Sequence, residues 1–195
     1  MAIVCVGVDL AKNVFAIHGV DDVGKAVWVQ PRVPRAQLLA AFSHLPPCLI
    51  GMEACSGAHH WARQLLAMGH KVRLIAPKFV TPYRLSGKRG KNDAADAAAI
   101  CEAVQRPHLR FVPIKSVEQQ AGLAVHRMRQ GFVEQRTALI NRLRGLLAEF
   151  GIVMAQKAAT VRRLASEQVD SLLGWMRVAA RDALDELARL DERIS

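Results

Sequence analysis

The chain has 195 residues, of which 51% are hydrophobic, so it can bury the core of one sizeable domain and is not disordered as a whole. It carries 27 basic and 17 acidic residues, and the resulting net charge of +10 indicates a polyanionic partner. Its four cysteines form no CxxC pair, which predicts reduced thiols in a cytoplasmic protein.

The positive charge is concentrated in two zones. Residues 71–115 carry a net charge of +7 and residues 126–163 a net charge of +6, whereas residues 164–195 carry −3. Two separate basic zones are more typical of nucleic-acid binding than a uniformly basic surface is. The first apolar run has no basic residues before it and breaks at Asp9, which excludes a signal peptide and a membrane span there.

The first half of the chain predicts an α/β domain. Strands are expected at residues 3–9, 13–20 and 25–30, and they must run antiparallel because their connections are too short for crossover helices. Pro31 and Pro34 are expected to end the third strand. The next elements are a helix, a strand, a helix and a strand, at residues 35–44, 48–53, 58–68 and 71–75. This order predicts a ribonuclease H-like mixed sheet with flanking helices, and not a doubly wound Rossmann sheet.

The second half of the chain predicts long helices. Apolar residues recur in near-heptad steps at Val125, Met128, Phe132, Leu139, Leu143, Leu146, Phe150 and Val153. This seam predicts a coiled-coil extension and a dimer or larger assembly, because its apolar face needs cover. We therefore divide the chain into a domain of residues 1–112 and a helical oligomerisation region of residues 113–195. Helical periodicity still runs at Ser195, so the chain is expected to be truncated.

Four carboxylates lie where predicted elements end or begin. Asp9 and Glu53 end strands that should be neighbours, while Asp93 and Asp96 lie on one face at the start of an alanine-rich helix. Grouped carboxylates repel one another, and Mg²⁺ or Mn²⁺ relieves that repulsion. Two such ions can activate a nucleophile and stabilise the leaving oxygen of a phosphodiester. We predict that all four acids are metal ligands and catalytic, although each alone could be a cap or a helix-dipole acid.

Basic residues next to these acids are candidates for nucleic-acid binding. Arg84, Lys88, Arg89 and Lys91 directly precede Asp93, although such a run can also be a solvated loop. A second predicted set lies off the heptad seam and consists of Arg127, Arg136, Arg142 and Arg144. The three tryptophans, Trp28, Trp61 and Trp175, are expected in the core and not as base-stacking platforms.

Three motifs together resemble one family: residues 6–12 (VGVDLAK), residues 51–54 (GMEA) and residues 91–97 (KNDAADA). The chain resembles the N-terminal part of DEDD-type insertion-sequence transposases, the group related to Piv DNA invertases, over nearly its whole length. The last motif is the most specific of the three.

The resemblance implies a RuvC-like domain in which Asp9, Glu53, Asp93 and Asp96 bind metal. It also implies a coiled coil that assembles a dimer or tetramer, a structured noncoding guide RNA that bridges donor and target DNA, and a prokaryotic, nucleoid-associated location. Family members carry a further domain whose serine becomes joined to DNA. Nothing in this sequence matches it, so we expect this chain alone to be inactive in strand transfer.

Three other functions are compatible with parts of the sequence. A non-catalytic nucleic-acid-binding and assembly module would need no serine domain. A RuvC-like junction nuclease would share the acids but would not need the long heptad helix. An actin-like or sugar-kinase ATPase would explain the phosphate-loop-like residues 7–12, but it would need a second glycine-rich phosphate motif.

Overall fold

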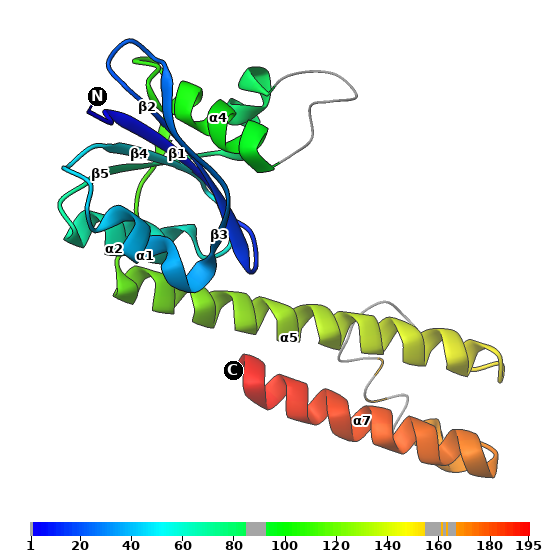
Figure 1. The fold of residues 1–195 in the computed structure, drawn as a ribbon. Helices are drawn as coiled ribbons and strands as arrows, with labels where there is room; N and C mark the ends of the chain where they lie inside the picture. The colour runs from blue at the N-terminus through cyan, green and yellow to red at the C-terminus, as the bar shows by residue number, and fades with distance from the viewer. Residues whose placement is uncertain (1, 85–92, 155–160, 162, 164–166) are drawn as a thin grey trace. The chain divides into compact units, whose positions relative to one another are not determined.

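The computed structural model describes residues 2–84, 93–154, 161, 163 and 167–195 (Figure 1). The chain forms two compact units, which we call the sheet unit (residues 1–116) and the helical unit (residues 117–195). Of the predicted nucleic-acid-binding residues, Lys88, Arg89 and Lys91 lie outside the described residues. None of the helices within the described ranges is long and apolar enough to cross a membrane.

Six strands form one mixed sheet in the sheet unit, in the order β3-β2-β1-β4-β5-β6. Antiparallel pairs join β1 to β2 and β2 to β3, as predicted, while β4 and β5 run parallel to β1 and β6 runs antiparallel to β5. The order is compatible with the predicted ribonuclease H-like fold. The strands are β1 (Cys5–Asp9), β2 (Val14–Val20), β3 (Ala26–Pro34), β4 (Leu49–Glu53), β5 (Lys71–Ile75) and β6 (Phe111–Val112).

Strand β3 is longer than predicted. It still pairs with β2 at Val33 and Pro34, so the expectation that it ends at Pro31 is wrong; the strand ends at Pro34. β3 is an edge strand, and the register shifts between Phe15 and Ile17 of β2, opposite this stretch. A proline lacks the N–H needed for a central ladder, but it is tolerated at sheet edges and bulges.

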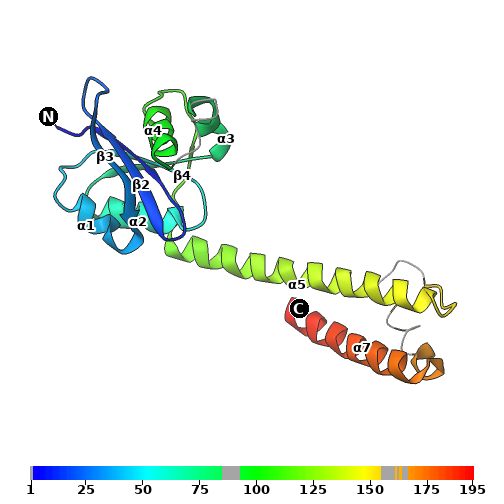
Figure 2. The same ribbon diagram turned by 45° about the vertical axis from the view of Figure 1, so that its right-hand side comes forward.

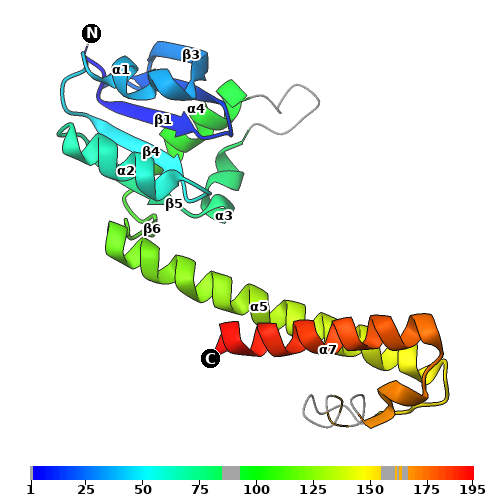
Figure 3. The same cartoon turned by 90° about the horizontal axis from the view of Figure 1, so that it is seen from below.

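Helices cover both faces of the sheet (Figures 1, 2 and 3). On one face lie α1 (Leu38–Phe42), which follows the 3₁₀ turn η1 (Arg35–Gln37), and α2 (Ala58–Ala67). They bury an apolar cluster that includes Phe42, Ile50 and Leu65. On the other face lies α4 (Asp93–Val104), which packs over a second cluster. Two short elements follow β5, namely α3 (Pro77–Val80) and η2 (Thr81–Tyr83).

Helix α4 packs on β1 and β4 through two glycines. A Cβ atom added to Gly7 would clash with the carbonyl oxygen of Ala97 and would lie 2.5 Å from the backbone nitrogen of Cys101. A Cβ atom added to Gly51 would lie 2.7 Å from Cβ of Val104. The facing side of α4 is built mainly from small residues, including the fully buried Ala97 and Ala103. The missing side chains therefore set the distance between α4 and the two strands.

The helical unit is an antiparallel hairpin of α5 (Val117–Ala148) and α7 (Gly174–Ile194), with the short η3 (Val169–Ser171) before α7. Its core contains Ile140, Leu143 and Leu147 of α5 and Leu187 of α7. Polar contacts also join the helices, because Arg136 pairs with Asp191 at 3.1 Å. The final helix predicted from leucine periodicity is confirmed, since Leu187, Leu190 and Ile194 are all buried.

The heptad seam is buried only in part. Leu143 packs inside the hairpin and Leu139 packs against its core, but α5 also uses Ile140 and Leu147, which lie off the predicted seam. A long coiled coil therefore stays a prediction. Five seam residues are exposed in this chain, namely Val125, Met128, Leu146, Phe150 and Val153.

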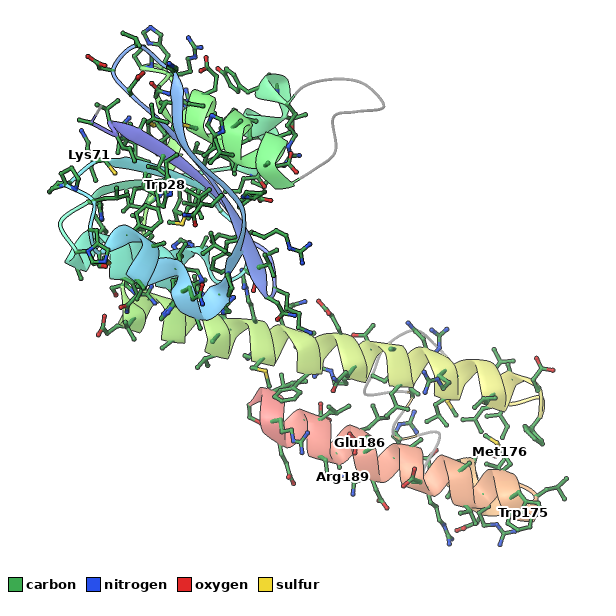
Figure 4. The ribbon with its side chains drawn as sticks, viewed as in Figure 1. Trp28, Lys71, Trp175, Met176, Glu186 and Arg189 are labelled. Atoms are coloured by element: carbon green, nitrogen blue, oxygen red, sulfur yellow. The ribbon has the colours of Figure 1, made fainter. Side chains whose placement is uncertain are left out.

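The tryptophans do not all lie in the core. Trp28 packs edge-on against Phe42 and Trp61 against Phe15, as expected. Trp175, however, is 92% exposed near the beginning of α7, so the core prediction is wrong for this residue (Figure 4). It lies five positions before the buried Ala180, which places it off the apolar stripe of the helix.

We predict that Gly7→Ala lowers the free energy of unfolding by about 1–3 kcal/mol, because its methyl group must push against the backbone of α4. Gly131→Ala in α5 is the matched control, since nothing lies within 4 Å of an added Cβ there. That change should stabilise the chain, by at most about 1 kcal/mol. Urea unfolding monitored by circular dichroism would measure both, and equal effects of the two substitutions would contradict the packing argument.

Candidate functional site

Two strand ends and one helix start define the candidate site. β1 and β4 are parallel neighbours with Val8 opposite Met52, so Asp9 and Glu53 follow at the same level at their carboxyl ends. Both residues are half-buried. Asp93 begins α4, which packs on these strands, although the position of its side chain is not described. Asp96 follows within the first turn of α4 and is also half-buried.

Arg84 joins two of these acids. Its Nη2 lies 2.8 Å from Oε1 of Glu53, and its Nε lies 2.8 Å from Oδ1 of Asp96. The Nε atom is buried and makes no hydrogen bond of good geometry within the described part of the chain, so its contact with Asp96 is an ion pair without a well-directed hydrogen bond. One guanidinium therefore holds a carboxylate from β4 and a carboxylate from α4.

The electrostatics extend the site to Asp9. Burial raises the pKa of the Glu53 carboxyl; Arg84 opposes this shift, and the negative charge of Asp96 adds to it. Burial also raises the pKa of the Cys55 thiol, and the charges of Glu53 and then Asp9 raise it further. Since Cys55 responds to both strand-end acids, Asp9 and Glu53 share one electrostatic neighbourhood.

The donor chemistry of these acids suits a hard divalent cation. Within the ranges described here, no group of three or more acids, cysteines or histidines is placed to hold a metal ion. Glu53 and Asp96 nevertheless already converge on one positively charged group, and Asp9 follows on the neighbouring strand. Oxygen ligands of this kind are those that Mg²⁺ and Mn²⁺ prefer.

The predicted basic residues differ in their surroundings. Arg84 contacts the acids, an arrangement that no short-range spacing in the sequence indicates. On α5, Arg127 and Arg142 are exposed, whereas Arg136 pairs with Asp191 of α7. Arg144 is half-buried and donates a long hydrogen bond to Asn141 at 3.5 Å.

A contact near α2 was not predicted. The backbone N–H of Lys115 donates to Nδ1 of His59 at 3.2 Å, and Arg63 donates to the carbonyl oxygen of Lys115 at 2.7 Å. Burial lowers the pKa of His59, and the charges of Lys115 and Arg63 lower it further. These contacts hold the segment after β6 against α2. Lys115 lies more than 50 residues after His59 and Arg63, so no local sequence pattern predicts the contacts.

A family model described as a transposase, DEDD type of the IS110 group, matches residues 6–152. The chain belongs to this family of insertion-sequence transposases. It is 48% identical over 195 residues to the "Probable family 20 transposase" of Pseudomonas aeruginosa, an alignment that covers 97% of this chain and 56% of that protein.

Two further relatives have similar coverage. The chain is 43% identical to the "Transposase for insertion sequence element IS1111A" of Coxiella burnetii, over 96% of this chain and 52% of the relative. It is 42% identical to the "Transposase for insertion sequence element IS1328" of Yersinia enterocolitica, over 83% of this chain and 47% of the relative. The chain thus spans about half the length of the curated relatives it matches.

The raised pKa of Glu53 predicts a pH-dependent effect on stability. Its carboxyl stabilises the folded state while protonated, and that contribution is fully present below about pH 4 and is lost as the pH rises through the raised folded-state pKa. The side chain of Glu53→Gln stays neutral at every pH. As the pH rises from acidic to neutral, the difference in melting temperature between the variant and the parent chain should therefore shift in favour of Glu53→Gln.

Thermal unfolding at both pH values measures this gain. Glu149→Gln, on the exposed end of the helical unit, controls for the general effect of removing one negative charge. A difference between parent and Glu53→Gln that stays constant with pH, or that shifts in favour of the parent as the pH rises, would contradict the burial argument.

Proposed function

We propose that this chain carries the metal-binding acid site of an insertion-sequence transposase, with Asp9, Glu53, Asp93 and Asp96 as metal ligands and catalytic acids. The observation that supports this most directly is the convergence of Glu53 and Asp96 on one cationic group at 2.8 Å each. Arg84 here stands in for a cation that the two carboxylates would otherwise share. The substrate is a DNA phosphodiester, as the family membership suggests.

The residues of the chain have distinct tasks in this proposal. Asp9 and Glu53 are held by paired strands, so their oxygens are presented from a rigid edge. Asp96 reaches the same place from α4, and Asp93 precedes it by three residues on the same helix. Mg²⁺ or Mn²⁺ bound to these acids would polarise phosphodiester oxygens and activate the attacking hydroxyl. Arg84, once displaced from the acids, would be available to bind a phosphate through its planar fork.

The basic residues support nucleic-acid partners. Lys88, Arg89 and Lys91 directly precede Asp93 in the sequence, and the exposed Arg127 and Arg142 add a second positive zone on α5. We propose that these groups bind DNA and a structured noncoding guide RNA during RNA-guided recombination. Strand transfer itself we assign to a protein of the relatives' full length, since this chain spans about half of it.

The exposed apolar residues of α5 support assembly with a second copy. Val125 and Met128 of α5 are 68% and 61% exposed, and Phe150, in the turn after α5, is 45% exposed. Burying side chains of this size stabilises each by about 1.5–3 kcal/mol. A dimer or tetramer formed through the helical unit would supply that cover.

A second candidate function is a non-catalytic binding and assembly module. The observation that favours it is the same ion-pair network, because Arg84 pairs with both Glu53 and Asp96 and offsets part of their negative charge. In that case the acids would serve only to fasten α4 and the segment after η2 to the sheet.

Calorimetric titration with Mn²⁺ distinguishes the two functions. If the acids bind metal, Asp96→Asn should weaken binding by at least about tenfold. Arg84→Gln should strengthen it, since it removes the competing cation. Asp182→Asn, an exposed acid on α7, controls for nonspecific attraction. Absence of saturable binding, or an unchanged affinity in Asp96→Asn, would favour the assembly module and refute the metal site.

A further inference from the structure

A hollow of about 680 Å³ lies beside η2 in the sheet unit, apart from the four acids. It is lined by Phe79 of α3, Tyr83 of η2 and three charged or titratable residues of the segment after α4, namely Arg106, His108 and Arg110. Its volume falls within the range of about 300–1,000 Å³ that is usual for small-molecule sites. Nothing in the preceding function uses these residues.

The walls of the hollow combine aromatic rings with positive charge. The Arg106 guanidinium lies 5.8 Å from the centroid of the Tyr83 ring, and Lys78 lies 5.0 Å from the centroid of the Phe79 ring. Glu102 forms an ion pair with Arg106 and offsets part of its charge. None of the described residues that line the hollow is acidic, and Arg110 adds a second guanidinium. The ligand should therefore be anionic.

The aromatic rings are only partly used by the core. Phe79 and Tyr83 pack against the buried cluster under α4, but both are half-buried and also face the hollow. A flat, apolar ring surface beside guanidinium groups matches a nucleotide, whose base stacks and whose phosphate binds arginine. Other small anions would use the arginines but would leave the rings unused.

The position of the hollow links it to the acid site. Tyr83 directly precedes Arg84, the residue that holds Glu53 and Asp96. A nucleic-acid strand bound at the acids could therefore place a neighbouring nucleotide at this hollow. Only an unpaired nucleotide has a free base face, because bases within a duplex are stacked on both sides.

We infer that this hollow binds one unpaired nucleotide of a nucleic-acid strand, with its base stacked on Tyr83 and its phosphate held by Arg106 and Arg110. The inference rests on the proposed function, because it names the form of nucleic acid that the chain holds next to its acids. The site should not discriminate between base sequences, because every base has an aromatic face that can stack. It would select single-stranded over double-stranded segments.

The test measures binding of fluorescent oligothymidylate, oligouridylate and a blunt duplex of two annealed strands to the full chain by anisotropy. Tyr83→Leu should weaken single-strand binding by about 5- to 100-fold, as expected for the loss of one base stack, and should leave duplex binding unchanged. Tyr83→Phe retains the ring and should bind like the parent. Trp175→Leu removes another exposed aromatic ring and should have no effect.

Arg110→Gln tests the phosphate contact on an exposed residue whose replacement leaves the core intact. It should lower the slope of log affinity against log salt for the single strands by about 0.7. Arg189→Gln, which removes an exposed guanidinium from α7 (Figure 4), is the matched control and should leave the slope unchanged. Tighter binding of oligouridylate than of oligothymidylate would support the site and assign it to RNA, and the reverse would support it and assign it to DNA.

Three results would overturn the inference: unchanged single-strand affinity in Tyr83→Leu, an equal loss for the blunt duplex, or an equal loss in Trp175→Leu. Mn²⁺ titration of the same variants separates this failure from failure of the acid site. If Tyr83→Leu and Arg110→Gln bind Mn²⁺ normally but show no defect in single-strand binding, the proposed nucleotide site is refuted and the acid site is not.

Discussion

The close approach of α4 to β1 and β4 is the constraint on which the candidate site depends. Side chains are absent at Gly7 and Gly51, and the buried alanines of α4 rest directly on the strands. A larger residue at either glycine would lift the helix and, with it, the first turn that carries Asp96. The same packing explains why an alanine-rich helix with few large apolar groups can still be a core element: its energy comes from close contact over its length.

Electrostatics in the site oppose that packing. The helix brings Asp96 toward Glu53, and both burial and the second negative charge disfavour ionisation of Glu53. Arg84 offsets this cost with two ion pairs of 2.8 Å. Removing one partner of such a network leaves a half-buried charge, which is usually more damaging than never having formed the pair. The Arg84 guanidinium is therefore the cationic group that stabilises these two carboxylates in the folded chain.

The sequence predicted the elements that local patterns control. Apolar runs ending on acids located β1 and β4, and with them Asp9 and Glu53, while the paired aspartates marked the start of α4. The errors concern features set by distant parts of the chain. Prolines in β3 are tolerated because the strand lies at the sheet edge, and α5 packs through Ile140 and Leu147 because of where α7 lies. The bridge from Arg84 to Glu53 spans 31 residues, which no spacing rule could reveal.

Helix α4 brings Asp96 to the strand-end acids, and we propose that one cation is shared between them. A double-mutant cycle on Mn²⁺ affinity, with Glu53→Gln, Asp96→Asn and the combined variant, tests it most directly. Ligands of the same ion are coupled, so the second substitution should cost less than it does alone, with a coupling energy of about 0.5–3 kcal/mol. Losses that simply add, or no loss from either substitution, would show that the two carboxylates do not share a cation and would contradict the account.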